Sequence, residues 1–451
     1  MLRAMSSERA SVDRVSFGEA LRFWVKLGFV NFGGPAGQIA IMHEELVDRR
    51  RWISEARFLH ALNYCVLLPG PEAQQLAIYV GWLLHRVKGG IVAGVTFILP
   101  AFFLILGLSW VYVTHGNVPE IAGVFAGLQA AVIGIVAAAG IRIGSRALRS
   151  PLTTGIAIGA FVGIYLAHVP FPFLILGAAF VGVVASRIAP ASLRLRSEEG
   201  DIAEEPYLRE DVKPTVRRSL LVLCVGLAVW IVPLIAVSAA SGSPSVVSDE
   251  AFFFSKAALV TFGGAYAVLA YINQAAVLQY HWLLPGQMVT GLGLAESTPG
   301  PLIMVTEFVG FIGAYRHPGA LDPTVAGIIG ATVTTWATFA PCFLWIFLGA
   351  PYIERLRSNR SLTSALGAVT AAVVGIIADV AVTFGIHTLF DQVRFVRVLR
   401  GPVPVPVLGS VDVFALGIAV ASFVAVWRFR VGVLWVVAIS AIAGVLRVIL
   451  R

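Results

Sequence analysis

The sequence predicts an all-α polytopic membrane protein with two inverted-topology repeats, broken or re-entrant helices and about 13 hydrophobic elements. Three observations predict this fold class: an apolar composition, a duplicated stretch, and glycine and proline at matching positions of the two copies. Of the 451 residues, 58% are apolar, and the mean hydropathy of +0.86 is far above that of a soluble domain. Since a bilayer offers no water to the backbone, we expect the spanning segments to be helices.

Nearly charge-free runs recur along the chain, and most are long enough to cross a hydrocarbon core of about 30 Å as a helix. They lie at residues 90–113, 121–141, 152–166, 171–185, 220–237, 325–348, 365–384, 413–426 and 431–450. Each half adds two segments that are interrupted by glycine or proline, which completes the expected number of elements.

One stretch occurs twice, because residues 23–71 reappear as residues 253–301 with a constant offset of 230 and no gap. The positions that agree are Lys26 with Lys256, Phe32-Gly33-Gly34 with Phe262-Gly263-Gly264, Trp52 with Trp282, and Pro69-Gly70-Pro71 with Pro299-Gly300-Pro301. The match continues at an offset of 241, where Pro100 corresponds to Pro341 and Gly134 to Gly375. Hydrophobic segments broken at matching positions of two halves indicate a transporter binding site.

Four parts follow from this pattern. We expect a first transmembrane repeat at 17–187, a cytoplasmic linker at 188–219, a connecting transmembrane helix at 220–240 and a second, inverted repeat at 250–451. The linker has an acidic middle and basic ends. The single connecting helix brings the second copy into the bilayer from the opposite side, so a pseudo-two-fold axis in the membrane plane should relate the copies.

The basic turn Asp48-Arg49-Arg50-Arg51 bears on how the interrupted segments are threaded. It joins the other basic loops on the cytoplasmic side if residues 23–47 and 58–84 are each re-entrant, and it lies outside if the first segment crosses once. The equivalent turn Gln279-Tyr280-His281 has no full positive charge, as expected of an outside loop. We favour the re-entrant or broken arrangement, although it leaves the basic residues at 394–400 outside without an explanation.

Several function classes are not predicted. The net charge of +8 comes from basic residues between apolar runs, which indicates contact with the lipid bilayer and no nucleic-acid partner. Cys65, Cys224 and Cys342 lack paired spacing, so we expect no disulfide, no metal and no cofactor. No serine, histidine and aspartate set or His-Glu-x-x-His run is evident, so an enzyme is not expected.

The interrupted segments have the chemistry of an anion site. A half-helix that begins at such a break exposes backbone N–H groups and the positive end of its dipole, and proline fits its first turn, as at Pro35, Pro71 and Pro301. The candidate substrate-binding residues are Lys26, Asn31, Gly33, Gly34, Gln38, Pro69, Gly70, Gln74, Gln75, Lys256, Thr261, Gly263, Gly264, Ser297, Thr298 and Gly300. The alternatives are that the glycines serve helix packing and that the lysines extend to the membrane surface.

Carboxylates beside the breaks are candidates for proton coupling. Glu72, Glu296 and Glu307 are the three, because a carboxyl group in apolar surroundings prefers its protonated form. The alternative is an ion pair with a lysine or a contact at a helix end. Glu72 corresponds to Leu302, and Glu296 to Val66, so the site should be pseudo-symmetric in backbone and asymmetric in charge.

The motifs Phe32-Gly33-Gly34-Pro35 with Gln38, and Leu68-Pro69-Gly70-Pro71-Glu72-Ala73-Gln74-Gln75, with their echoes in the second half, resemble the chromate transporter family over nearly the whole chain. The resemblance implies a secondary active antiporter of the bacterial inner (plasma) membrane that exports chromate, is driven by protons and confers chromate resistance. Sulfate or another oxyanion as substrate, and a passive anion channel, are the alternatives. The sequence leaves the oligomeric state undecided, and a homodimer is one of the alternatives.

Overall fold

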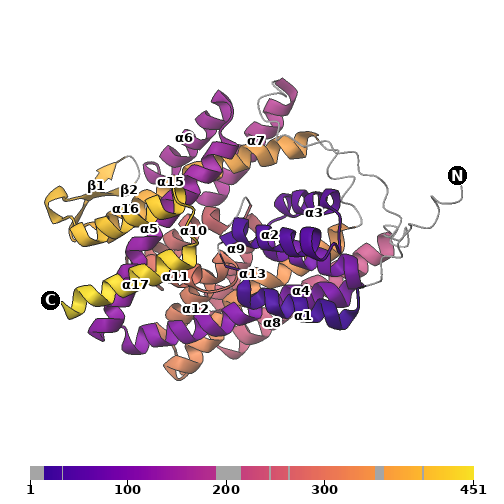
Figure 1. Ribbon diagram of the computed structural model, residues 1–451, viewed down its shortest axis with the longest axis horizontal. Helices are drawn as coiled ribbons and strands as arrows, with labels where there is room; N and C mark the ends of the chain where they lie inside the picture. The colour runs from indigo at the N-terminus through magenta and orange to yellow at the C-terminus, as the bar shows by residue number, and fades with distance from the viewer. Residues whose placement is uncertain are drawn as a thin grey trace, which may run out of the picture.

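The computed structural model describes residues 15–32, 34–188, 215–242, 245–262, 265–350, 360–398 and 401–450. The described chain is almost entirely helical (Figure 1). The first half holds α1 (Phe17–Val30), α2 (Gly34–His43), the π-helical turn η1 (Glu44–Arg49), α3 (Glu55–Leu67), α4 (Glu72–His115), α5 (Pro119–Ala147), α6 (Pro151–Tyr165) and α7 (Phe171–Ile188). The expected linker lies for the most part outside the described residues.

After α8 (Val216–Ala240), the second half repeats this order. It holds α9 (Val246–Val260), α10 (Ala265–Asn273), the π-helical turn η2 (Gln274–Gln279), α11 (Gln287–Ser297), the 3-10 turn η3 (Leu302–Met304), α12 (Val305–Arg316), α13 (Pro323–Gly349), α15 (Arg360–Leu389), β1 (Val393–Val398), β2 (Gly401–Pro406), η5 (Leu408–Ser410), α16 (Val413–Trp427) and α17 (Val433–Ile449). The interrupted segments α1 to η1 and α9 to η2 both end in a π-helical turn, and α5, α6 and α7 correspond to α15, α16 and α17. The prediction of a two-repeat, all-helical membrane protein is confirmed.

Length and composition support membrane crossing. Among the described helices, six are long and apolar enough to span a bilayer, namely α4, α5, α7, α8, α13 and α15, and the shorter α6, α16 and α17 are also apolar. On α8, large apolar side chains such as Val232 and Ile235 are 59% and 61% exposed. A face of this kind suits lipid better than water.

The first interrupted segment of the first repeat is re-entrant. Arg50, directly after η1, forms an ion pair of 3.6 Å with Glu19 near the start of α1. Its guanidinium also lies 5.1 Å from the ring centroid of Phe23. The beginning and the end of the segment are therefore side by side, so the chain enters and returns instead of crossing.

The second interrupted segment returns in the same way. Its outgoing half is the first part of α4, which ends at a sharp turn where His85 and Arg86 leave the helical conformation. The ring nitrogen Nε2 of His85 lies 2.8 Å from the carbonyl oxygen of Val15, which places this turn beside the start of α1. A Cβ at Gly81, before the turn, would lie 2.5 Å from the carbonyl oxygen of Gly89, after it, so the two parts of α4 pack closely against each other.

The second repeat has the same arrangement. The ring of Phe253, on α9, lies 5.8 Å from the rings of both Tyr280 and Trp282, which follow η2. Arg316, at the end of α12, donates a hydrogen bond of 3.4 Å to the carbonyl oxygen of Trp282. Trp282 is 1% exposed and so packs in the core.

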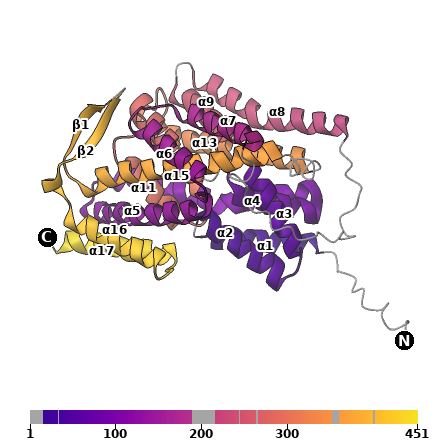
Figure 2. The same ribbon diagram turned by 90° about the horizontal axis from the view of Figure 1, so that it is seen from above.

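Helices of the two halves pack against one another. In the views of Figures 1 and 2, α16 and α17 lie along α5, and α15 lies along α6 and α7. The matched glycines explain the close approach: a Cβ at Gly134 would lie 2.6 Å from the backbone nitrogen of Phe423, and one at Gly375 would lie 2.9 Å from that of Phe161. Each repeat thus packs its third-last long helix, α5 or α15, against the last two helices of the other.

We expect Gly375→Ala to destabilise the protein by about 1–3 kcal/mol, because the added methyl group would collide with the carbonyl group of Ala157. Thermal unfolding of the purified protein in detergent measures this effect. Gly155→Ala is the matched control, since a Cβ at Gly155 would have no atom within 4 Å and alanine favours a helix. Equal unfolding temperatures for Gly375→Ala and the unmodified protein would contradict the close helix crossing.

One small element departs from the all-helical prediction. Strands β1 and β2 form an antiparallel hairpin with Arg394 opposite Val405 and Phe395 opposite Pro404. The side chain of Arg394 is exposed, so the basic residues that the sequence left unexplained begin on a hairpin outside the helical body (Figure 2).

Candidate functional site

The breaks of the two repeats are joined by reciprocal hydrogen bonds. The backbone N–H of Gly70 donates to the carbonyl oxygen of Thr261 over 2.8 Å, and that of Gly300 donates to the carbonyl oxygen of Asn31 over 3.3 Å. Gly70 corresponds to Gly300, and Asn31 to Thr261, at the offset of 230. Each Pro-Gly-Pro turn is therefore bonded to the end of the first half-helix of the other repeat.

Only glycine suits these two turns. Gly70 and Gly300 have φ values of +121° and +124°, which L side chains rarely adopt. A Cβ would also lie 2.9 Å from Sγ of Cys342 at Gly70, and 2.5 Å from Cβ of Ala101 at Gly300. Cys342 and Ala101 each follow the matched proline of a long helix, α13 and α4 respectively, so each turn packs against the long helix of the other repeat.

Helix ends converge where the Gly70 and Gly300 turns are hydrogen-bonded to the other repeat. The half-helix α4 begins directly after Pro71, η3 and then α12 begin after Pro301, and Pro35 is the second residue of α2. The fourth half-helix, α10, begins at Ala265 without a proline. The first turn of each half-helix carries backbone N–H groups without partners inside the helix and a partial positive charge. Helix starts of both repeats thus bring unpaired backbone N–H groups to these turns.

Four buried amide side chains surround the breaks. Asn31, Gln38, Gln74 and Gln75 are all 0% exposed. Gln38 donates to the carbonyl oxygens of Asn31, over 3.0 Å, and Gly300, whereas Gln75 donates to that of Pro69 over 2.7 Å. These bonds hold the two turns in place.

Gln74 differs from the other three amides. Neither its nitrogen nor its oxygen has a hydrogen-bond partner among the described residues, although the side chain is fully buried. A buried polar group without a partner is costly, and such groups in native proteins usually serve a ligand, a water or a moving part. Gln74 lies in the first turn of α4, so its amide can donate to an anion held at that helix end.

Three predicted hydroxyl groups are bonded within their own helices. Thr261 donates to the carbonyl oxygen of Ala257 over 2.6 Å. Ser297 and Thr298 both donate to that of Leu294, over 2.8 and 3.1 Å. These residues thus lie at the breaks, but their hydroxyl groups already donate to carbonyl oxygens of their own helices.

The predicted glycines are only partly described. Gly34 is the first residue of α2 and has a φ of +65°, so the break there again uses the left-handed region. Gly33, Gly263 and Gly264 lie outside the described residues.

The predicted lysines are not brought to the buried centre. Lys26 and Lys256 are both exposed. Lys256 lies 6.0 Å from the ring centroid of Tyr271 and lines an open surface cavity of about 380 Å³. Within the described ranges, no lysine or arginine is among the buried residues. The polar groups that lie at the breaks are therefore helix ends and neutral amide side chains.

The three predicted carboxylates have different surroundings. Glu72 is the first residue of α4 and is half-buried at the break. Glu296, on α11, is 4% exposed and accepts a hydrogen bond from the hydroxyl of Tyr266, a partner that the sequence did not suggest. Glu307, on α12, is 0% exposed, and its oxygens have no partner in the described part of the chain.

A third fully buried carboxylate, besides Glu296 and Glu307, was missed. Glu250, on α9, is also 0% exposed. It lies next to Asp249, which is exposed, and acidic residues are common in the first turns of helices, so nothing in the sequence set it apart.

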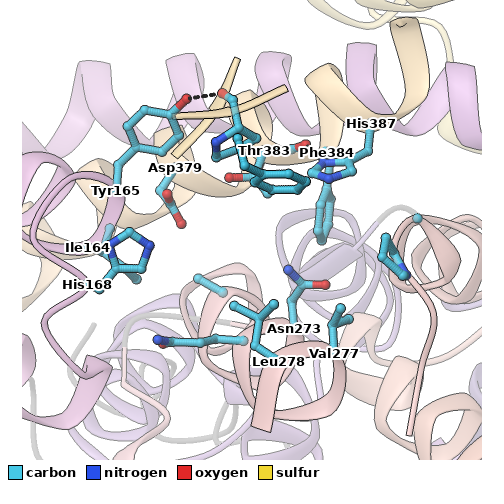
Figure 3. A pocket seen from close by; sticks show the side chains of 16 residues that line it. Ile164, Tyr165, His168, Asn273, Val277, Leu278, Asp379, Thr383, Phe384 and His387 are labelled. Carbon is cyan, nitrogen blue, oxygen red and sulfur yellow. Dashed lines mark hydrogen bonds between the residues drawn. The ribbon is translucent and has the colours of Figure 1, made fainter. Parts of the chain in front are cut away.

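A cavity of about 170 Å³ lies at the far end of α10 (Figure 3). Its polar lining comes from Tyr165, His168, Asn273, Gln274, Asp379, Thr383 and His387. Asp379 lines this space, and Tyr165 donates to the carbonyl oxygen of Pro404 over 3.3 Å. In the described residues no group of three or more His, Cys, Asp or Glu is placed to hold a metal ion. The cavity has room for several water molecules, about 13 Å along α10 from the break.

Comparisons with known proteins identify the family of the chain and its two repeats. The family model described as "Chromate transporter" matches residues 18–183 and 249–445, which are the two repeats. The chain is 30% identical over 433 residues to the "Chromate transport protein" of Pseudomonas aeruginosa, with 95% of this chain and 92% of the relative covered. It is 30% identical to the "Chromate transport protein" of Cupriavidus metallidurans (83% and 84% covered) and 29% identical to the "Probable chromate transport protein" of Synechococcus elongatus (84% and 87% covered). No solved structure matches the chain.

Proposed function

Since this chain belongs to the chromate transporter family, we propose that it is a secondary active transporter that exports chromate across the bacterial inner membrane and thereby confers chromate resistance. The relatives that are named for a substrate are all named for chromate, which favours chromate over sulfate. Both are tetrahedral dianions of similar size, so sulfate is kept as the competing substrate.

The observation that carries this proposal is the reciprocal pairing of the breaks. The Gly70 N–H to Thr261 bond and the Gly300 N–H to Asn31 bond bring half-helix starts from both repeats to one place. A dianion is stabilised there by helix dipoles and backbone N–H groups, with Gln74 as a further donor. Such a site binds without a permanent cation, so an emptied site carries no charge that must cross the membrane.

Alternating access follows from the way the site is shared. Because the first repeat (17–187) and the second (250–451) each contribute breaks, a rocking movement of one repeat against the other turns the site from one side to the other. The hydrogen bonds from Gly70 and Gly300 lie at the pivot of that movement. A passive channel would instead keep these breaks as a fixed filter.

Proton coupling is assigned to Glu72, Glu296 and Glu307. Glu307 has no hydrogen-bond partner in the described structure, and Glu296 has only the hydroxyl of Tyr266. Uncharged, protonated carboxyl groups tolerate such surroundings, and a conformation that admits water releases the proton. An antiporter needs this alternation between proton and anion.

Reconstitution in liposomes tests the proposal. We expect the purified protein to accumulate chromate against its concentration gradient when a proton gradient is imposed, and to lose this accumulation when a protonophore is added. Sulfate uptake, measured in the same vesicles, decides between the two anions. Flux that only follows the anion gradient would identify a channel, and the absence of flux for both anions would refute the proposal.

A further inference from the structure

Glu250 is buried without any polar partner. It lies in the second turn of α9, is 0% exposed, and neither carboxyl oxygen has a hydrogen-bond partner in the described chain. At the offset of 230 its counterpart is Ala20, so the first repeat has no equivalent group. A carboxylate in such a place costs several kcal/mol unless it is neutralised.

Two glycines make the space for this carboxyl group. A Cβ at Gly313, on α12, would lie 2.6 Å from Oε1 of Glu250, and a Cβ at Gly330, on α13, would lie 2.8 Å from Oε2. These two helices also touch each other here, because a Cβ at Gly310 would lie 2.7 Å from the carbonyl oxygen of Gly330. The carboxyl group therefore lies between three helices, with one glycine facing each oxygen.

The helices packed on α9 are α8, α10, α12 and α13, and their ionisable groups do not pair with Glu250. These groups are Arg217, Arg218 and Cys224 on α8, Tyr266 and Tyr271 on α10, Glu307, Tyr315 and Arg316 on α12, and Cys342 on α13. The two arginines of α8 lie at its opposite end, about 30 Å along the helix from the part that contacts α9. On α9 itself, Asp249 and Lys256 are exposed.

The cation that lies closest along the packed helices is already bound. Arg316 is three residues beyond Gly313 on α12, but it donates to Oε1 of Gln287 over 2.7 Å and to the carbonyl oxygen of Trp282. The indole of Trp282 also packs against Gly313, since a Cβ at Gly313 would be 3.0 Å from its ring. Without a cation, the uncharged form of Glu250 is the one that fits this arrangement.

We propose that Glu250 is a proton-binding residue of the transport cycle, located away from the anion site and coupled to it through α12. This inference rests on the proposed proton-coupled export. The helix α12 follows directly on η3, which starts at the Pro299-Gly300-Pro301 break, and it carries Glu307 before Gly313. Any movement of the break on anion binding therefore shifts Gly313 against α9.

The direction of coupling follows from this geometry. In the closed packing described here, Glu250 holds its proton. When α12 moves away from α13, water reaches the carboxyl group and the proton leaves. By linkage, anion binding then favours proton release and protonation favours anion release, as an antiporter requires.

The test compares Glu250→Gln with the unmodified protein in chromate-loaded and empty liposomes. Glutamine keeps the shape and the neutral state but releases no proton. We expect accumulation of chromate driven by a proton gradient to fall about tenfold or more, while chromate counterflow without a gradient persists. Glu250→Asp, which can still titrate, should retain part of the gradient-driven accumulation. Glu120→Gln, on the exposed first turn of α5, is the control and should behave as the unmodified protein.

Each outcome of this experiment supports or overturns the role of Glu250. If Glu250→Gln accumulates chromate as well as the unmodified protein, the inference is wrong and the proposed export stands. If both Glu250 variants lose counterflow as well as accumulation, Glu250 has a structural role and the inference is wrong. If the unmodified protein itself shows no proton-driven accumulation, the proposed function fails, and this inference fails with it.

Discussion

Gln74→Leu is expected to weaken chromate binding about 10- to 100-fold, because a hydrogen bond to a charged group contributes about 1.5–3 kcal/mol. The same substitution should leave the unliganded protein at least as stable as the unmodified one. The reason is that both amide atoms of Gln74 are buried without a partner in the described structure, so leucine removes an unsatisfied polar group and keeps the volume. The affinity is read from the KM for chromate in liposomes, and the stability from thermal unfolding in detergent.

A weaker affinity for chromate together with an unchanged or higher stability would identify a ligand contact, whereas a structural contact would lower the stability. The control is Gln129→Leu, because Gln129, on α5, donates its side-chain amide to Oγ1 of Thr290. There we expect lower stability and an unchanged KM. If Gln74→Leu instead lowered the stability and left the KM unchanged, Gln74 would be a packing residue, and the anion site would need other donors.

Gly300→Ala and Gly70→Ala should each abolish most of the transport. A residue with a side chain at φ near +120° costs about 1–3 kcal/mol in backbone strain. The collision with Ala101 or Cys342 adds about 1–3 kcal/mol. The turn is expected to relieve this strain by moving, which breaks the hydrogen bond to the other repeat.

Chromate uptake at equal protein content in the vesicles measures this effect, and size-exclusion chromatography reports whether the variant is still folded. Gly319→Ala is the matched control, since Gly319 also has a positive φ, +62°, but a Cβ added there would have no atom nearby. It should transport normally. Normal uptake by both Gly70→Ala and Gly300→Ala would mean that the reciprocal bonds are not needed for transport.

The breaks were visible in the sequence because glycine and proline act on their own backbone. Gly70 and Gly300 interrupt apolar runs at the same position of two copies, and that signal needs only neighbouring residues. For the same reason the number of hydrophobic elements and the inverted repeat followed from composition and offset. The β hairpin was missed because β2 has proline at every second position, and proline in a run argues against a strand.

The sequence did not reveal which single ionisable groups are buried. Lys256 and Glu250 lie six residues apart on α9, and the sequence drew attention to the lysine because it has a counterpart in the other copy. The lysine is exposed, whereas the glutamate is fully buried between α12 and α13. Which face of α9 meets those helices depends on packing far away in sequence, so periodicity within α9 did not reveal it.

By itself, the sequence determined that this protein is a helical membrane protein of two inverted repeats, and it located the breaks at Gly34, Gly70 and Gly300. These features follow from local hydrophobicity and backbone freedom. Only the tertiary structure decided that the interrupted segments are re-entrant and that each turn is bonded to the other repeat. It also decided which polar groups are left without partners, Gln74 and Glu250 among them. The physical reason is that hydrogen bonding and burial are properties of contacts between distant segments, which no stretch of sequence carries alone.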